Sequence, residues 1–448
     1  MSLNLVLGRG LESLEGTEET TVSNEIAVAE LAAAIADRDE ARAESETARI
    51  VNELDNDQRN IDEFVATADQ MSNLQASMEH FQEAGLTQRA ASLLSGQFAQ
   101  LVGSVGGDAS KITGSMESIN EDNGAAILTA GIEALEDEKK GLMQRAVDVV
   151  KKVWDGIVSF FGQLFSQSER YKARAEKLIG AAADMEAGKK EVKVSNKNLV
   201  LGKEYSKNLS GDFGKFKDFI KEVLETHVNN SSNWMTTDVK LAMGGMLKAT
   251  TPADAAKHLA ALNKFTFKGA TTKVTETANA GIYRTDLYLG NTCVIVQKPK
   301  VNSSDDSASN VIAALNALSK YRITVRQAET TGAPKEGTTS IDAADVKAIA
   351  NNVIDVMAIV KEAKDKRIGK LGLAVSNMIG SLKSDMNKDA TPEMKKIHNA
   401  AFRIPVMANN VIADVPRTGA SAAMSVSAAV MAACESATKA KEEKKDDK

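Results

Sequence analysis

The stretch from residue 138 to residue 182 decides the fold class, and it reads EKKGLMQRAVDVVKKVWDGIVSFFGQLFSQSERYKARAEKLIGAA. Apolar side chains recur in it every three or four residues, which is the spacing of one broad face of an α-helix. The pattern predicts one long helix with a buried middle and a charged end, Ser168 to Lys177. The apolar face consists of Met143, Val147, Val150, Val153, Trp154, Ile157, Val158, Phe161, Leu164 and Phe165.

Helical spacing also occupies much of the chain on both sides. Residues 24–81 contain neither Pro nor Gly and predict one or two long acidic helices. Glycines and serines between residues 96 and 124 predict loops, and a short helix over residues 125–135 precedes the long one. Further helices are expected over residues 203–227 and 342–386. The fold class is therefore mainly α, with long amphipathic helices and a helical bundle.

A small antiparallel β (α+β) module is predicted around residues 265–326. A helix over residues 308–321 and a strand over residues 322–326 would complete it. Residues 192–201 also have a strand-like pattern, whereas residues 330–340 predict a loop. The strands of the module are expected in β-branched or alternating runs separated by Gly and Asn. These runs are Phe265–Phe267, Thr271–Thr275, Ile282–Leu289 and Thr292–Val296.

These elements divide the chain into five predicted regions. The first is an acidic helical N-terminal segment and candidate propeptide, and the second is a helical region with the hydrophobic central helix. The α+β module, a C-terminal helical region and a charged tail that we expect to be disordered follow. Their bounds are 1–136, 137–230, 231–330, 331–438 and 439–448.

The charge of the chain changes sign within a few residues, between Glu138 and Lys139. Residues 1–138 hold 27 Asp and Glu against 7 Lys and Arg, a net charge of −20. The other 310 residues hold 34 acidic and 48 basic side chains, a net charge of +14. Such an asymmetry indicates that the two parts have different partners.

The sequence contains no catalytic or metal-binding pattern. Its two cysteines, Cys293 and Cys434, are typical of buried reduced thiols. Its four histidines lack the paired spacing of a metal site, and no phosphate-binding glycine loop occurs. We therefore expect no enzyme, no cofactor and no metal. We also expect no secretory signal, and no run of the roughly 20 apolar residues that would span a bilayer.

Residues 153–165, VWDGIVSFFGQLF, are the most apolar and aromatic part of the chain. A helix that is apolar all round is usually the buried centre of a bundle, which is the interpretation we favour. The alternative is a membrane-active, pore-forming-like protein that inserts this stretch into a bilayer. The side chains expected to face a partner or a membrane are Trp154, Phe160, Phe161 and Phe165.

Lysines of the basic part occur as scattered pairs without interleaved aromatic residues. This pattern does not predict sequence-specific recognition, but it suits contact with the phosphates of double-stranded DNA in bulk. The alternative for any single pair is a solvated surface of mixed charge. The candidate DNA-contacting residues are Lys139, Lys140, Lys151, Lys152, Lys189 and Lys190.

Eight glutamates of the acidic segment end a triplet of a small residue, any residue and Glu: Glu12, Glu15, Glu18, Glu25, Glu79, Glu117, Glu133 and Glu136. An acidic helical segment with such triplets, followed by a basic body, resembles the internal head proteins of large contractile-tailed bacteriophages. The resemblance implies that a maturation protease cuts after one of these glutamates. We expect the cut after Glu133 or Glu136, because residues 137–448 then keep a net charge of +12 and the removed piece carries −18.

The resemblance implies a virion structural protein that is made in the host cytoplasm and packaged inside the head. Its expected partners are capsid or prohead core proteins, the maturation protease and non-specific double-stranded DNA. A basic body suits packed DNA, because a negatively charged protein would be repelled from it. The membrane-active protein stays an alternative, as does a helical scaffold or tail component without DNA contact.

Overall fold

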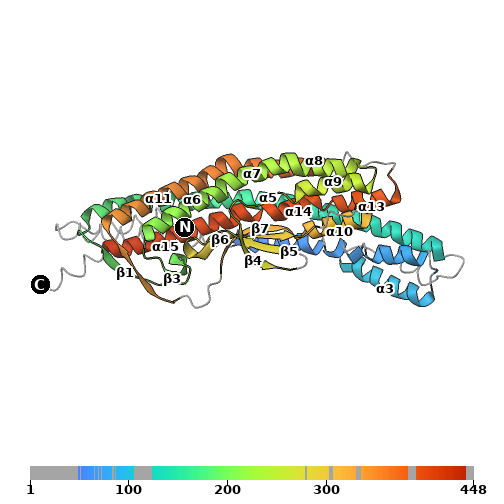
Figure 1. Cartoon of the computed structure of the whole chain (residues 1–448), viewed down its shortest axis with the longest axis horizontal. Coiled ribbons are helices and arrows are strands. Elements are labelled where there is room, and N and C mark those ends of the chain that lie inside the picture. The colour runs from blue at the N-terminus through green and yellow to red at the C-terminus, as the bar shows by residue number, and fades with distance from the viewer. Residues whose placement is uncertain are drawn as a thin grey trace, which may run out of the picture. The chain divides into compact units, whose positions relative to one another are not determined.

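The computed structural model describes most of the chain between residues 49 and 439 (Figure 1). The chain divides into two units, Met1–Asn52 and Glu53–Lys448, and the fold below is that of the second. Part of the helix predicted over residues 24–81 lies outside the described residues. These are 49–50, 52–64, 66–68, 70–71, 73–82, 85, 87–104, 124–277, 280–301, 306–328, 334–381 and 390–439.

The longest helix, α5, runs from Gly124 to Ala181 and contains the stretch predicted as the main helix. It is one helix of 58 residues, whereas the sequence predicted two helices separated near residue 136. Leu128, Leu135 and Leu142 are buried at seven-residue spacing across the expected break. Because packing of an apolar face contributes most of a helix's stability in a protein, this buried line keeps α5 continuous.

Helices of the C-terminal half pack along α5 and form the predicted bundle (Figure 1). The closest of them is α11, and α6 packs against α11 in turn. The mainly α fold class is therefore confirmed. In addition to α5, the bundle contains α6 (Leu209–Lys221), α11 (Ala343–Glu362), α12 (Gly369–Ser381), α14 (Ile404–Ile412) and α15 (Asp414–Lys439).

Three π-helical turns lie within the helices of the described residues, a feature that the sequence did not predict. In such a turn each backbone N–H bonds one residue further back than in an α-helix. Arg367 in one π turn is only 9% exposed and pairs with Glu225 in another at 3.4 Å. After α6 the chain continues through η3 (Glu222–His227), α7 (Val228–Trp234), η4 (Met235–Val239) and α8 (Lys240–Lys248), and η6 (Ala363–Ile368) joins α11 to α12.

Helix α3, Gln88–Ser104, lies partly in a stretch that was predicted as loop. The prediction was wrong there because Leu94, Phe98 and Val102 are buried at four-residue spacing, which outweighs the low helix propensity of the intervening Gly96. The remaining helices are α9 (Pro252–Leu262), α10 (Ala308–Leu318) and α13 (Pro392–Ala401), with 3₁₀ turns η1 (Ala182–Asp184), η2 (Lys197–Leu199) and η5 (Leu289–Asn291).

The predicted β module is present as a four-stranded antiparallel sheet with α10 between its last two strands in sequence. Its strand order is β4-β5-β6-β7. Residues 265–267, predicted as a strand, are not one, because the ring of Phe265 stacks on Trp234 at 4.5 Å instead. The strands are β4 (Thr272–Glu276), β5 (Ala280–Arg284), β6 (Thr292–Pro299) and β7 (Arg322–Gln327).

Two short antiparallel pairs complete the described sheets. Strand β1 (Lys190–Val194) pairs with β8 (Gly337–Ile341), so part of the predicted loop over residues 330–340 is a strand. The two partners are almost 150 residues apart, and no local pattern indicates such a pairing. The second pair joins β2 (Val200–Leu201) to β3 (Glu204–Tyr205).

Within the described part of the chain, one helical stretch, Pro392–Thr438, is long and apolar enough to cross a membrane by length and composition. This differs from the expectation that no run of the chain has the roughly 20 apolar residues needed to span a bilayer. Its most apolar window is 61% buried inside the protein. Burial of this kind is also found in the core helices of soluble proteins, so the stretch is weak support for a membrane span.

Candidate nucleic-acid interface

The acidic segment of the second unit is helical over residues 53–64, 66–68, 70–71 and 73–82 and packs through an apolar stripe. A buried side chain falls every three, four or seven residues along this stripe, which is the spacing of one helix face. Each member is at most 5% exposed. They are Leu54, Ile61, Ala68, Met71, Leu74 and Met78.

Gly156 of α5 allows the acidic segment to approach closely. A Cβ atom at this position would lie 2.7 Å from Cδ2 of Leu54, which is nearer than van der Waals contact permits. Because Gly156, within the apolar stretch 153–165, has no side chain, Leu54 can pack directly against the backbone of α5 at this point.

Four carboxylates of the acidic segment pair with cations of the basic body. Asp57 pairs with Lys152 on α5 at 2.9 Å. Asp62 pairs with Arg322 at the start of β7 at 2.7 Å. The other two pairs are Asp55 with Arg417 of α15, at 2.8 Å, and Glu79 with Lys396 of α13.

These four pairs differ in how far they are shielded from water. The side chain of Asp57 is 11% exposed and that of Arg417 is 12% exposed, while Lys152 remains 68% exposed. A partly buried carboxylate needs a partner, because an uncompensated charge away from water costs several kcal/mol. The acidic segment thus neutralises cations on α5, α13, α15 and β7 together.

Amide side chains add a polar contact between the acidic segment and α14. Gln58 accepts a hydrogen bond from Nδ2 of Asn409 at 3.1 Å and donates one to Oδ1 of Asn410. Asn410 in turn donates to the carbonyl of Ser319 at 3.1 Å. Asn409 and Asn410 are both buried, so loss of Gln58 would leave them short of partners.

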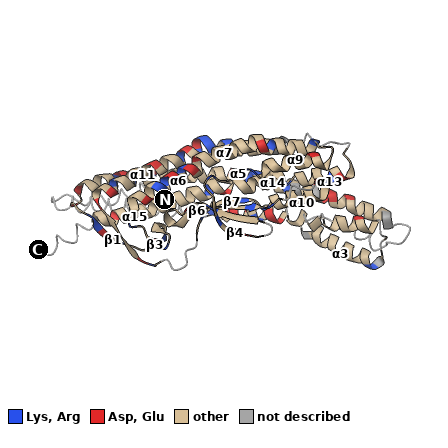
Figure 2. Ribbon diagram, viewed as in Figure 1, with Lys and Arg blue, Asp and Glu red and all other residues tan. Residues whose placement is uncertain are grey.

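The candidate DNA-contacting lysines are not gathered into one patch. Lys151 pairs with Asp148 at 3.8 Å and Lys189 with Asp345 at 4.0 Å, whereas Lys152 pairs with Asp57 of the acidic segment. Lys190 lies in β1 and is half-buried. The side chains of Lys139 and Lys140 in α5 are not among those that the structure describes. Figure 2 shows residues of both signs interspersed along α11.

The candidate apolar residues of α5 lie mostly in the core. Trp154, Phe160 and Phe161 are at most 2% exposed. Phe165 is half-buried, and the ammonium groups of Lys361 and Lys364 lie over its ring at 5.0 and 4.3 Å. This burial favours the bundle interpretation of residues 153–165.

The candidate cleavage residues Glu133 and Glu136 lie inside α5. Glu133 is exposed, whereas Glu136 is half-buried and accepts a hydrogen bond from Nε2 of Gln75 at 3.2 Å. Proteases act on opened rather than helical chain, so cleavage here requires local unfolding of α5. Gly141 lowers the cost of that opening, because glycine destabilises a helix interior by about 0.5–1 kcal/mol relative to alanine.

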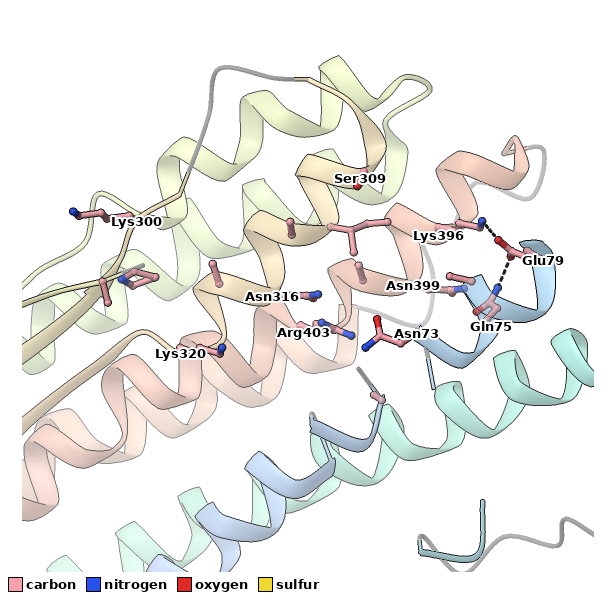
Figure 3. A pocket seen from close by; sticks show the side chains of 18 of the residues that line it. Asn73, Gln75, Glu79, Lys300, Ser309, Asn316, Lys320, Lys396, Asn399 and Arg403 are labelled. Carbon is pink, nitrogen blue, oxygen red and sulfur yellow. Dashed lines mark hydrogen bonds and ion pairs between the residues drawn. The ribbon is translucent and has the colours of Figure 1, made fainter. Parts of the chain in front are cut away.

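A pocket of about 800 Å³ opens where the acidic segment meets the body (Figure 3). One wall is the acidic segment, and the others are α10, α13 and the end of β6. Asn316 and Arg403 extend toward Asn73 across it in Figure 3. Four cations line it, namely Lys300, Lys320, Lys396 and Arg403.

Sequence reasoning missed most of the cations that the acidic segment covers. Arg322 and its partner Asp62 are 260 residues apart, so no local pattern joins them. The sequence feature that could have indicated these cations lies in the acidic segment. Asp55 and Asp62 are seven residues apart beside the apolar stripe, which places both on one helix face that must meet positive partners.

Comparison with known proteins gives a family for nearly the whole chain. The family model of phiKZ-like phage internal head proteins matches residues 46–436. No curated protein and no solved structure matches. The match includes the acidic helix, the bundle and the β module described above. The chain therefore belongs to the phiKZ-like phage internal head proteins and lies inside the phage head.

Proposed function

We propose that this head protein is non-enzymatic and that its acidic N-terminal segment masks a basic body until a maturation protease removes the segment. The cut would follow Glu133 or Glu136, and the freed body would accompany the packaged DNA. The observation that supports this most is the set of four ion pairs between residues 53–82 and the body.

Attachment of the acidic segment to the body and masking of the body's positive charge depend on different contacts. Exposed ion pairs contribute only about 0–1 kcal/mol each, whereas burial of a Leu, Ile or Met side chain contributes about 1.5–3 kcal/mol. The apolar stripe therefore supplies most of the attachment, and the carboxylates supply the charge compensation. A cut in α5 alone would leave the segment bound until it dissociates from the body.

Release of the segment would expose cations to DNA phosphates. Lys152, Arg322 and Lys396 would lose the carboxylates paired with them here, Arg417 would keep only Asp414 at 3.1 Å, and the remaining chain has a net charge of +12. Each phosphate contact releases counterions, so binding becomes dependent on salt. The three cations that lose their partners give a slope of about −2.7 in a plot of log affinity against log salt concentration.

The processing step is tested by mapping the N-terminus of this protein in purified mature particles by mass spectrometry. We expect a chain that begins at Ala134 or Asp137. A chain that still begins near Met1 would refute the processing step.

The masking step is tested by comparing the full-length chain with the processed chain recovered from particles. Binding to a labelled random-sequence DNA duplex is measured between 50 and 200 mM salt. We expect the processed chain to bind more tightly, with the steeper salt dependence. Equal affinities and equal slopes for the two chains would refute masking, whatever the N-terminal mapping shows.

A further inference from the structure

The pocket at the edge of the acidic segment has an excess of positive charge. Among its lining residues that the structure describes are three Lys and one Arg, but only one carboxylate, that of Glu79. Glu79 pairs with Lys396, and Lys300 pairs with Glu276 outside the pocket at 2.8 Å. Lys320 is exposed and has no carboxylate partner among the residues that the structure describes.

Amide groups complete a lining that suits oxyanions. Asn73, Gln75, Gln297, Asn316 and Asn399 line the pocket beside the cations. Amide N–H groups and ammonium or guanidinium groups together are the donors that bind phosphate oxygens. None of the described lining residues is aromatic, so the pocket offers no surface on which a base would stack.

The size of the pocket also limits the ligand. A volume of about 800 Å³ falls within the range of small-molecule sites and far exceeds the volume of one phosphate group. Several linked phosphates would fill it better than a single ion.

From this lining and size we propose that the pocket binds a run of linked phosphates in the unprocessed chain. The source is either the backbone of a nucleic acid or a free polyphosphate chain, because both present the same oxygens. The proposal rests on the proposed function only for the presence of DNA near the protein.

Binding in this pocket is coupled to the acidic segment, since Glu79 belongs to the segment and Lys396 to the body. A phosphate that contacts Lys396 competes directly with the Glu79 carboxylate. By reciprocity, a ligand that weakens this contact loosens the segment, and loss of the contact strengthens ligand binding. The pocket is therefore the place where phosphates begin to displace the masking helix.

The binding site is tested on the full chain with two probes, inorganic tripolyphosphate in calorimetry and a labelled DNA duplex in fluorescence anisotropy. We expect Lys320→Gln to weaken binding roughly 5- to 10-fold and to reduce the salt slope for the duplex by about 1. Lys240→Gln is the matched control, because Lys240 is an exposed lysine of α8 that lies outside the pocket.

Binding of either probe with selective loss in Lys320→Gln supports the site, and the probe that binds identifies the phosphate source. The proposal is overturned if neither probe binds, or if Lys240→Gln weakens binding as much as Lys320→Gln. Neither of these results bears on the N-terminal mapping, and a failure of processing leaves this test unaffected.

The coupling is tested with Glu79→Gln, which removes the competing charge. We expect its affinity for tripolyphosphate to rise by roughly 2- to 5-fold, the equivalent of one surface ion pair. Glu63→Gln, an exposed carboxylate outside the pocket on the same segment, is the control. Hydrogen exchange of residues 73–82 should accelerate when tripolyphosphate binds. Equal effects of the two variants, or unchanged exchange, would overturn the coupling.

Discussion

Replacing Gly141 by alanine should slow cleavage of α5 at Glu133 and Glu136. Gly141 is five residues from the nearer bond, lies on the exposed side of the helix, and has open space where a Cβ would be placed. The substitution therefore adds helix propensity without a clash, worth about 0.5–1 kcal/mol. If the protease acts on a locally opened helix, the population of the open form falls by the same free energy, about 2- to 5-fold.

The assay is limited proteolysis of the full chain by a Glu-specific endopeptidase. Mass spectrometry follows the appearance of chains that begin at Ala134 or Asp137. Gly162→Ala is the matched control, since Gly162 also lies in α5 with open space around it but is 26 residues from the Glu136 bond. We expect Gly141→Ala to slow the cut and Gly162→Ala to leave it unchanged. Equal slowing by both variants would mean that cleavage requires global unfolding, and no slowing by either would refute local opening.

Three further predictions concern stability and reactivity. Burial lowers the pKa of His227 to about 3, below its unfolded value of about 6.5, so the unfolded chain takes up the proton first. The free energy of unfolding should therefore fall by about 1.4 kcal/mol for each pH unit between about 6.5 and about 3, and urea titrations of His227→Leu should lack this contribution. A double-mutant cycle on Asp57 and Lys152 should give a coupling of roughly 0.5–1 kcal/mol that decreases in 1 M salt, and no coupling at low salt would contradict the ion pair's role. Burial raises the pKa of both thiols, that of Cys434 to about 12, so Cys293 and Cys434 should react with Ellman's reagent only after unfolding.

Local patterns predicted those parts of the fold that depend on local packing. The helical spacing around Trp154 predicted the middle of α5, and the β-branched runs near Cys293 predicted β6 and its neighbours. Both signals come from residues whose burial repeats with the period of their own element. The prediction of the small antiparallel module was confirmed because its strands show such a local period.

Contacts between distant parts of the chain could not be predicted in this way. The pairing of β1 with β8 places Lys190 opposite Ile341, and the sequence of neither strand indicates the other as its partner. The same holds for Arg417, whose role appears only when Asp55 is brought beside it. The π turns were also missed, since each depends on how neighbouring helices pack rather than on the composition of its own residues.

The continuity of α5 has a consequence for the mature body. A cut after Glu136 would leave Asp137–Ala181, 45 residues of the helix, as the first element of the new chain. Asp137 and Glu138 would then occupy its first turn, where each carboxylate interacts favourably with the helix dipole by about 0.3–1 kcal/mol. The last acidic residues before the charge boundary would thus become the stabilising amino-terminal turn of the processed protein.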